Sequence, residues 1–172
     1  MDLIDHVRTV PDFPVPGILF YDVASLLEQP EVWRSVLDRL AAHLRAWEPE
    51  VIAGIESRGF LLAAPLAERL GVPMMMVRKA GKLPGETLRF EYDLEYGTDS
   101  IEIQTSALGA GQRVAIVDDL LATGGTLAAS VALCRQAGAD VVGCGVIIEL
   151  PFLNGREKVA APLVSLMTPH DG

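Results

Sequence analysis

The stretch that decides the fold reads Val114-Ala115-Ile116-Val117-Asp118-Asp119-Leu120-Leu121-Ala122-Thr123-Gly124-Gly125-Thr126. Its first four residues are apolar, as is typical of a buried strand. Two carboxylates follow, then a turn with two glycines and two threonines, and then a helical pattern. Because ligands of open α/β sheets bind at the carboxyl ends of strands, we expect this turn to form a binding site.

The chemistry of this turn suits a phosphorylated sugar. Gly124 and Gly125 allow a tight turn and a close backbone approach, and the N-terminus of the following helix offers unpaired N–H donors and a partial positive charge. The two aspartates would repel a phosphate, so we expect them to accept hydrogen bonds from neighbouring sugar hydroxyls and to contribute to a metal site. Two acids in a solvated turn are the alternative. The residues expected to bind the phosphate and its ribose are Asp118, Asp119, Ala122, Thr123, Gly124, Gly125 and Thr126.

The rest of the chain alternates apolar runs with helical patterns, which predicts an α/β fold with a mainly parallel central sheet flanked by helices. Helices are expected at 31–47, 58–70 and 126–136, and strands at 51–55, 73–77, 114–117, 141–148 and 163–166. Residues 88–95 alternate apolar and polar side chains, which predicts a half-buried strand that returns at 101–104 after a turn at 96–100. Residues 12–21 are rich in proline and aromatic residues and are expected to form an ordered, irregular loop.

Length and composition favour one globular domain over residues 1–172, of which half are apolar. The net charge of −9 argues against DNA or RNA as a partner, because a nucleic-acid surface needs clustered Lys and Arg. No apolar run reaches the roughly 20 residues that a membrane span needs, and the first residues lack the features of a signal peptide. We therefore expect a cytoplasmic protein with no membrane partner. Cys134 and Cys144 are interpreted as core thiols.

The deciding stretch resembles the type I phosphoribosyltransferases, whose loop holds the 5′-phosphate of phosphoribosyl pyrophosphate while the paired acids contact the ribose hydroxyls. Five further segments resemble the adenine-specific branch of that family: FPVPGILFYD at 13–22, GIESRGF at 54–60, RKAGKLPG at 78–85, LEYG at 94–97 and GREK at 155–158. The resemblance implies purine salvage, in which adenine and phosphoribosyl pyrophosphate give AMP and pyrophosphate. It also implies Mg²⁺ as cofactor, a homodimer, a base-binding hood over residues 1–30 and a flexible loop and hairpin lid over 79–104.

The resemblance assigns the pyrophosphate to two segments. Glu56, Ser57 and Arg58 lie between a predicted strand and a predicted helix, where a helix N-terminus and a cation favour an anion. Arg78, Lys79 and Lys82 place three cations within five residues of a chain that has three lysines. A helix start with a solvated Arg58 and a solvated loop are the alternatives. Whether Arg78 serves its own site or that of a partner subunit stays open.

The resemblance also assigns the residues that bind the base and the residue that handles its proton. Leu19, Phe20, Tyr21 and Leu150 are the expected base-binding residues. Phe20 would stack on the purine, although it is equally compatible with a core position, and backbone groups near Leu19 and Tyr21 would read the purine edge. The family commonly has Arg where this chain has Tyr21, which leaves the strictness of adenine specificity open.

The expected catalytic residues are Glu95, Asp118 and Asp119. In the family, the glutamate that matches Glu95 manages the proton on the adenine ring nitrogen, whereas alternation alone would make it a solvated residue. Mg²⁺ would be held mainly through substrate oxygens and water, so no residue is assigned as a direct metal ligand. A phosphoribosyltransferase for 6-oxopurines (guanine, hypoxanthine or xanthine) and a non-catalytic sensor of phosphoribosyl pyrophosphate are the alternative functions.

Overall fold

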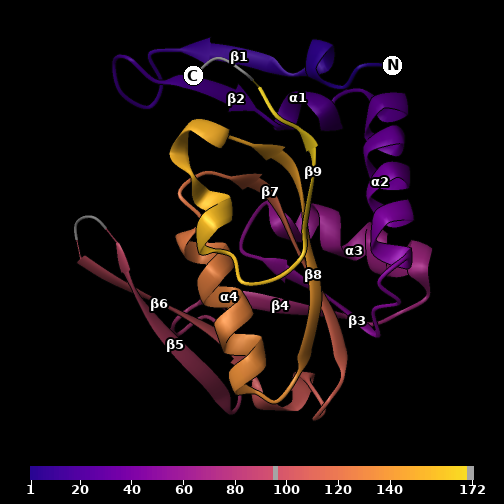
Figure 1. Cartoon of the computed structure of the whole chain (residues 1–172), viewed down its shortest axis with the longest axis vertical. Coiled ribbons are helices and arrows are strands. Elements are labelled where there is room, and N and C mark those ends of the chain that lie inside the picture. Colours follow the sequence, from indigo (N-terminus) through magenta and orange to yellow (C-terminus); the bar gives the residue numbers. More distant parts are fainter. Residues whose placement is uncertain (95–96, 170–172) are drawn as a thin grey trace.

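A seven-stranded sheet forms the centre of the computed structural model, which describes residues 1–94 and 97–169 (Figure 1). Its strands are β3 (Val51–Ile55), β4 (Met74–Lys79), β5 (Thr87–Leu94), β6 (Gly97–Gln104), β7 (Arg113–Leu121), β8 (Asp140–Glu149) and β9 (Leu163–Met167). They lie in the order β5-β6-β4-β3-β7-β8-β9. The five strands from β4 to β9 in this order are parallel, and β6 and β5 continue the sheet in antiparallel pairing. The predicted α/β fold with a mainly parallel sheet is therefore confirmed.

Helices cover both faces of this sheet, as Figure 1 shows. The helices α2 (Pro30–Arg45) and α3 (Gly59–Leu70) pack on one face, and α4 (Gly125–Gln136) packs on the other. Along β3, Ile52 belongs to the first apolar core, whereas its neighbours Val51 and Ala53 belong to the second. This alternation follows from strand geometry, in which successive side chains point to opposite faces. Both faces of a parallel sheet are thereby buried.

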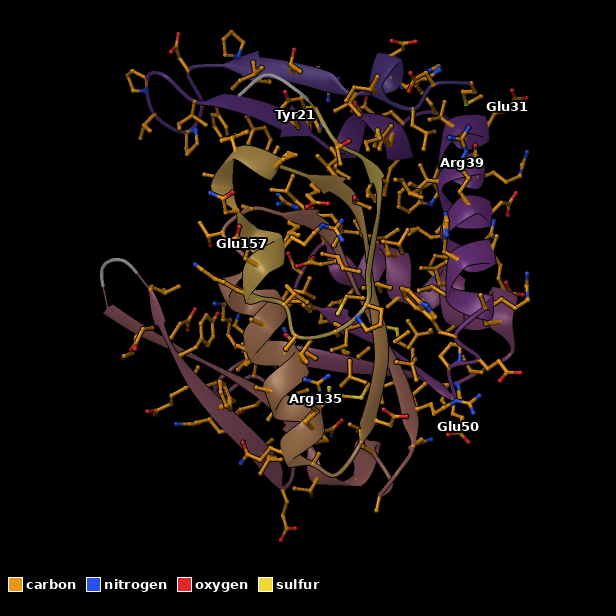
Figure 2. All side chains as sticks on the ribbon, in the orientation of Figure 1. Tyr21, Glu31, Arg39, Glu50, Arg135 and Glu157 are labelled. Carbon is orange, nitrogen blue, oxygen red and sulfur yellow. The ribbon has the colours of Figure 1, made fainter. Side chains whose placement is uncertain are left out.

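The helix α2 shows why its sequence forms an amphipathic element. Val32, Val36, Leu40 and Leu44 recur at four-residue steps and are buried against the sheet. Glu31 and Arg39 of the same helix, labelled in Figure 2, are exposed instead. None of the helices in the described part of the chain is long and apolar enough to cross a membrane.

The first 30 residues form a small layer above the end of the sheet (Figure 1). It contains a 3-10 helix, η1 (Ile4–His6), the antiparallel pair β1 (Arg8–Pro11) and β2 (Leu19–Asp22), and the short helix α1 (Ala24–Leu27). The prediction of an irregular loop over 12–21 is wrong for its last three residues, because residues 19–21 lie in β2. The prolines at 14 and 16 stand in the connection between the two strands, so they do not interrupt the pairing.

Several strands extend further than the sequence predicted. The predicted strand 114–117 continues as β7 through both aspartates, because β8 runs beside it and pairs Asp118 with Val146 and Leu121 with Glu149. The prediction of a turn at 96–100 is wrong for residues 97–100, because they lie in β6, which begins at Gly97. Short 3-10 helices, η2 (Thr105–Ala107), η3 (Pro151–Leu153) and η4 (Gly155–Lys158), complete the described elements. The extension of β7 brings both acids to the carboxyl edge of the sheet.

Candidate active site

A cavity of about 410 Å³ lies at the carboxyl ends of β3 and β7. Its wall contains the whole predicted phosphate set and four of the six predicted pyrophosphate residues. It is lined by Glu56, Ser57, Arg58, Lys79, Asp118, Asp119, Leu120, Leu121, Ala122, Thr123, Gly124, Gly125, Thr126 and Leu127. Because Lys79 is the last residue of β4, the ends of three strands (β3, β4 and β7) contribute to one site, as expected for the binding edge of a parallel sheet.

The turn after β7 is built to expose backbone donors. Gly124 has φ +81°, a left-handed conformation that favours glycine, and α4 begins at the next residue. Ala128 donates its N–H to the Gly124 carbonyl at 2.9 Å, which is the first hydrogen bond of the helical turn. The N–H groups of residues 125–127 precede this bond, so they have no partner within the helix. Because these residues line the cavity, they offer donors to an anion there.

The two aspartates are close together and differ in their surroundings. The Asp119 side chain is buried and lies 2.6 Å from Arg58 Nε, measured to Asp119 Oδ2. Asp118 Oδ1 accepts the backbone N–H of Asp119 at 2.9 Å. Burial, and then the charge of Asp119, raise the pKa of Asp118 well above its usual range. The pair therefore concentrates negative charge that a hydroxyl donor or a cation would stabilise.

Gly59 allows α3 to start beside these acids. A Cβ at this position would lie 2.9 Å from the Val117 carbonyl oxygen and 3.1 Å from Asp118 Oδ1. The first is shorter than real Cβ contacts, and the obstructing atom belongs to the backbone. The N-terminus of α3 can therefore approach β7 this closely only with glycine at position 59.

Glu56 holds the predicted pyrophosphate cations together. It accepts hydrogen bonds from Lys82 Nζ at 2.5 Å, from the Lys79 backbone N–H at 2.9 Å and from Arg78 Nη2 at 3.4 Å. Burial alone would raise the pKa of Glu56, but these three donors outweigh it and lower the pKa to about 2. Arg78 and Lys82 are not on the cavity wall, yet Glu56 brings both of them next to it.

The hairpin of β5 and β6 contributes two residues that contact the cavity wall, Tyr92 and Asp99, and sequence reasoning missed both. Lys79 Nζ forms an ion pair with Asp99 and donates a hydrogen bond to Tyr92 Oη at 3.3 Å. Tyr92 Oη lies 3.2 Å from Thr126 Oγ1, and the hydrogen bond from Lys79 lowers the pKa of Asp99. Tyr92 stands at an apolar position of the alternating strand predicted at 88–95. Its hydroxyl was the available signal, because a phenol on an inward face usually finds a polar partner.

The predicted base-binding residues lie apart from this cavity. Leu19, Phe20, Tyr21 and Leu150 are all described, and none of them is on its wall. Phe20 is half-buried and meets Phe13 edge-on, with 5.0 Å between ring centroids. The Tyr21 side chain is buried in the apolar core beneath β2 (Figure 2). Glu95 lies outside the described residues. In the described part of the chain, no group of three or more His, Cys, Asp or Glu side chains is arranged to hold a metal ion.

The chain is similar to known phosphoribosyltransferases over most of its length. The family model for the phosphoribosyl transferase domain matches residues 22–162. An adenine phosphoribosyltransferase of Rhodospirillum rubrum is 58% identical over 167 residues, which cover 97% of this chain and 98% of that protein. One of Rhodospirillum centenum is 55% identical over 168 residues and covers 98% of both.

Solved structures give the same result. The crystal structure of adenine phosphoribosyltransferase from Saccharomyces cerevisiae, complexed with D-2,5-dideoxy-2,5-imino-altritol 1,6-bisphosphate and adenine, superimposes with a TM-score of 0.92. Its sequence is 43% identical, and the match covers 96% of each chain. The protein described here belongs to the phosphoribosyltransferase family, within the group of adenine phosphoribosyltransferases.

The ion cluster around Glu56 predicts a specific dependence of stability on pH. Because the pKa of folded Glu56 is about 2, below its ordinary 4.5, the ionised side chain stabilises the fold above pH 4.5, and this contribution is lost as the pH falls toward 2. We expect Glu56→Gln to lower the free energy of unfolding at neutral pH. The gap to the wild type should narrow as the pH falls from about 5 to about 2.

Urea unfolding at a series of pH values measures this gap. Glu31→Gln, on the exposed side of α2, is the control for removing one surface carboxylate (Figure 2). A gap for Glu56→Gln that stays constant over the whole acidic range would contradict the role assigned to its three donors.

Proposed function

We propose that this chain transfers the 5-phosphoribosyl group from phosphoribosyl pyrophosphate to adenine and so forms AMP and pyrophosphate in purine salvage. The observation that carries the proposal is the single cavity in which an exposed helix N-terminus, two adjacent aspartates and a set of cations meet. Relatives that are named adenine phosphoribosyltransferases and match nearly the full length of the chain support adenine as the acceptor. The yeast relative was solved with adenine bound.

The proposed roles follow from the chemistry of each part of the cavity. The turn 122–126 would bind the 5′-phosphate through backbone N–H groups and the hydroxyls of Thr123 and Thr126. Asp118 and Asp119 would accept hydrogen bonds from the ribose hydroxyls. The transition state should carry oxocarbenium character at the sugar and growing negative charge on the pyrophosphate. Stabilising that charge is the role we give to the group Glu56, Ser57, Arg58, Arg78, Lys79 and Lys82.

The cations of this group are paired with carboxylates of the chain itself. Arg58 pairs with Asp119, Lys82 and Arg78 pair with Glu56, and Lys79 pairs with Asp99. A pyrophosphate group would replace these carboxylates as the partner of the cations. Carboxylate oxygens, which resemble phosphate oxygens as acceptors, thus hold the cations beside the cavity before a ligand arrives. This limits the entropy cost of ordering the cation side chains when the ligand binds.

We place the adenine under the hood of residues 1–30, with Phe20 stacked on the purine and Leu19, Tyr21 and Leu150 around it. Because the Tyr21 side chain is buried in the core, its contact with the base would use the backbone. On this view the difference from the Arg usual in the family matters little for adenine. Glu95 would manage the proton of the adenine ring nitrogen. The segment 79–104 would close over the site and exclude water from the sugar cation.

Mg²⁺ is the cofactor we propose. Asp118 and Asp119 present carboxylate oxygens at the cavity wall, which is the donor chemistry that Mg²⁺ prefers. Burial, and then the charge of Asp119, raise the pKa of Asp118, and a divalent cation nearby would favour its ionised form. These residues would help hold an ion whose other ligands are substrate oxygens and water. When bound, the ion neutralises charge on the leaving pyrophosphate.

A homodimer in the cytoplasm is the setting we propose. Leu61 on α3 and Met76 on β4 are large apolar side chains that are 48% and 39% exposed, on two elements in contact with each other. Such exposure is consistent with burial against a second copy, and sedimentation of the purified chain at micromolar concentration tests it. The buried free thiols of Cys134 and Cys144 suit a reducing compartment.

Two other functions have less support. A phosphoribosyltransferase for 6-oxopurines would share the phosphate turn, so the acceptor base distinguishes the two. A sensor of phosphoribosyl pyrophosphate would bind the same ligand without turnover. The names of the relatives favour an adenine-specific enzyme over both.

We expect AMP to form when adenine, phosphoribosyl pyrophosphate and Mg²⁺ are supplied together. Guanine, hypoxanthine and xanthine should react at least about 100-fold more slowly. A site that hydrogen-bonds the edge of adenine would leave some of its polar groups without partners when a 6-oxopurine is bound. Chromatography of the nucleotide products measures this, and chelation of the metal should abolish the reaction. Faster reaction with a 6-oxopurine would shift the assignment to the first alternative.

The paired acids should be required for turnover and dispensable for folding. We expect Asp118→Asn combined with Asp119→Asn to reduce kcat for AMP synthesis by about 100-fold or more, because both acceptors at the ribose are weakened. Asn keeps the shape of each side chain, so thermal unfolding should change little. Asp140→Asn, at the exposed amino end of β8, is the control and should retain activity. A double variant with near-normal turnover would remove the role of the acids.

A further inference from the structure

The backbone of the 3-10 helix η4 contacts the backbone of the turn at residues 122–126 (the phosphate turn), with no side chain between them. A Cβ built on Gly155 would lie 2.2 Å from the Ala122 carbonyl oxygen and 2.9 Å from the Gly124 nitrogen. Conversely, a Cβ built on Gly124 would lie 2.3 Å from the Gly155 carbonyl oxygen. Real Cβ atoms essentially never come within 3.0 Å of a neighbour. The two segments are therefore in contact at a distance that leaves no room for a side chain on either.

Side-chain contacts fix η4 in this place. Arg156 directs its guanidinium at the buried Glu149 carboxylate, with Nε donating to Oε1 at 2.8 Å and Nη2 paired with Oε2. Its Nη1 donates to the Leu163 carbonyl at 2.9 Å. Ser165 Oγ donates to Glu149 Oε2 at 2.7 Å. This network joins η4 to the end of β8 and the beginning of β9, which are rigid parts of the sheet.

Glu149 of this network also lies next to Leu121, the residue that precedes the phosphate turn. Glu149 is paired with Leu121 in the register of β7 and β8, and Leu150 donates its N–H to the Leu121 carbonyl at 2.9 Å. The turn therefore leaves β7 directly beside the residues that hold Arg156. Figure 1 shows η4 (yellow) meeting the N-terminal end of α4 (orange), which the turn precedes.

We propose that Gly155 is a positioning residue for the phosphate turn, with Arg156 holding it in place. The Gly155 backbone supports residues 122–124 from behind, so that the donors of residues 125–127 and the Thr123 hydroxyl keep one arrangement toward the ligand. Donors fixed before binding need not be ordered on binding, and an error of about 1 Å in their placement costs up to about 100-fold. The proposal rests on the proposed function, in which this turn binds the 5′-phosphate.

Gly155→Ala tests the contact directly. Gly155 is not among the glycines with positive φ, so an alanine is opposed by the Ala122 and Gly124 backbone and not by its own conformation. The probes are AMP and adenosine, which differ by the phosphate, titrated calorimetrically into the wild type and each variant. We expect Gly155→Ala to bind AMP about 10-fold to 100-fold more weakly and adenosine nearly as before, so the AMP-to-adenosine affinity ratio falls.

A matched control separates this effect from the addition of a methyl group. Gly109 also has an ordinary φ, and a Cβ there would meet the Gln112 side chain at 3.7 Å, an ordinary contact. Gly109→Ala should keep the wild-type ratio. A folded Gly155→Ala variant with an unchanged ratio would overturn the proposal, and so would an equal loss of affinity for both probes, since that indicates a general disturbance.

A second variant decides the case if Gly155→Ala does not fold. Arg156→Gln removes the two guanidinium contacts with Glu149 without adding volume against the turn. We expect the same fall in the AMP-to-adenosine affinity ratio. An unchanged ratio would overturn the proposal. Failure of the proposed function gives a different result: the wild type itself would then bind AMP no more tightly than adenosine, and the inference would fall with it.

Discussion

Backbone segments meet without side chains between them at the carboxyl end of β7, and the rest of the site depends on this close approach. On one side, Gly59 lets the start of α3 reach the Val117 carbonyl. On the other side, Gly124 and Gly155 bring η4 against the turn that begins α4. Two helix N-termini thereby converge on one strand end, with their N–H groups near the same cavity. The sheet supplies the rigidity, since β7 is buried between β3 and β8.

The hairpin of β5 and β6 is attached to this rigid centre in a different way. It joins the sheet where β6 pairs with β4 at Arg78 and Lys79, beside the cations that Glu56 holds. Its contact with the phosphate turn is made by side chains, through Tyr92 and Thr126. Leu88 and Phe90 of β5 also pack on the apolar core to which α4 contributes. The hairpin is therefore held by strand pairing with β4, by apolar packing and by the contact of Tyr92 with Thr126.

The sequence predicted what is encoded locally. The strand at 51–55 and the helix predicted at 31–47, which the structure has at Pro30–Arg45, follow from short-range apolar patterns. The turn carries its glycines, hydroxyls and acids within nine residues, from Asp118 to Thr126. What was missed depends on distant partners. The extension of β7 requires β8 beside it, and the link from Asp99 to Lys79 exists because β6 and β4 are neighbours in space. The role proposed for Gly155 is likewise invisible without the turn that it touches.

A net charge of −9 is compatible with binding a polyanion, because the local arrangement of charge outweighs the total. Charges on distant surfaces are screened over about 10 Å at moderate salt, so the field in the cavity is set by its own wall. On this wall, Glu56 and Asp119 are paired with cations, and Lys79 is paired with Asp99 behind it. Backbone donors at the start of α4 add positive potential that no count of side chains includes. The acidic residues near the cavity thus hold cations beside it, in a chain whose overall charge is strongly negative. Under the proposed function, a bound pyrophosphate would take over as the partner of these cations.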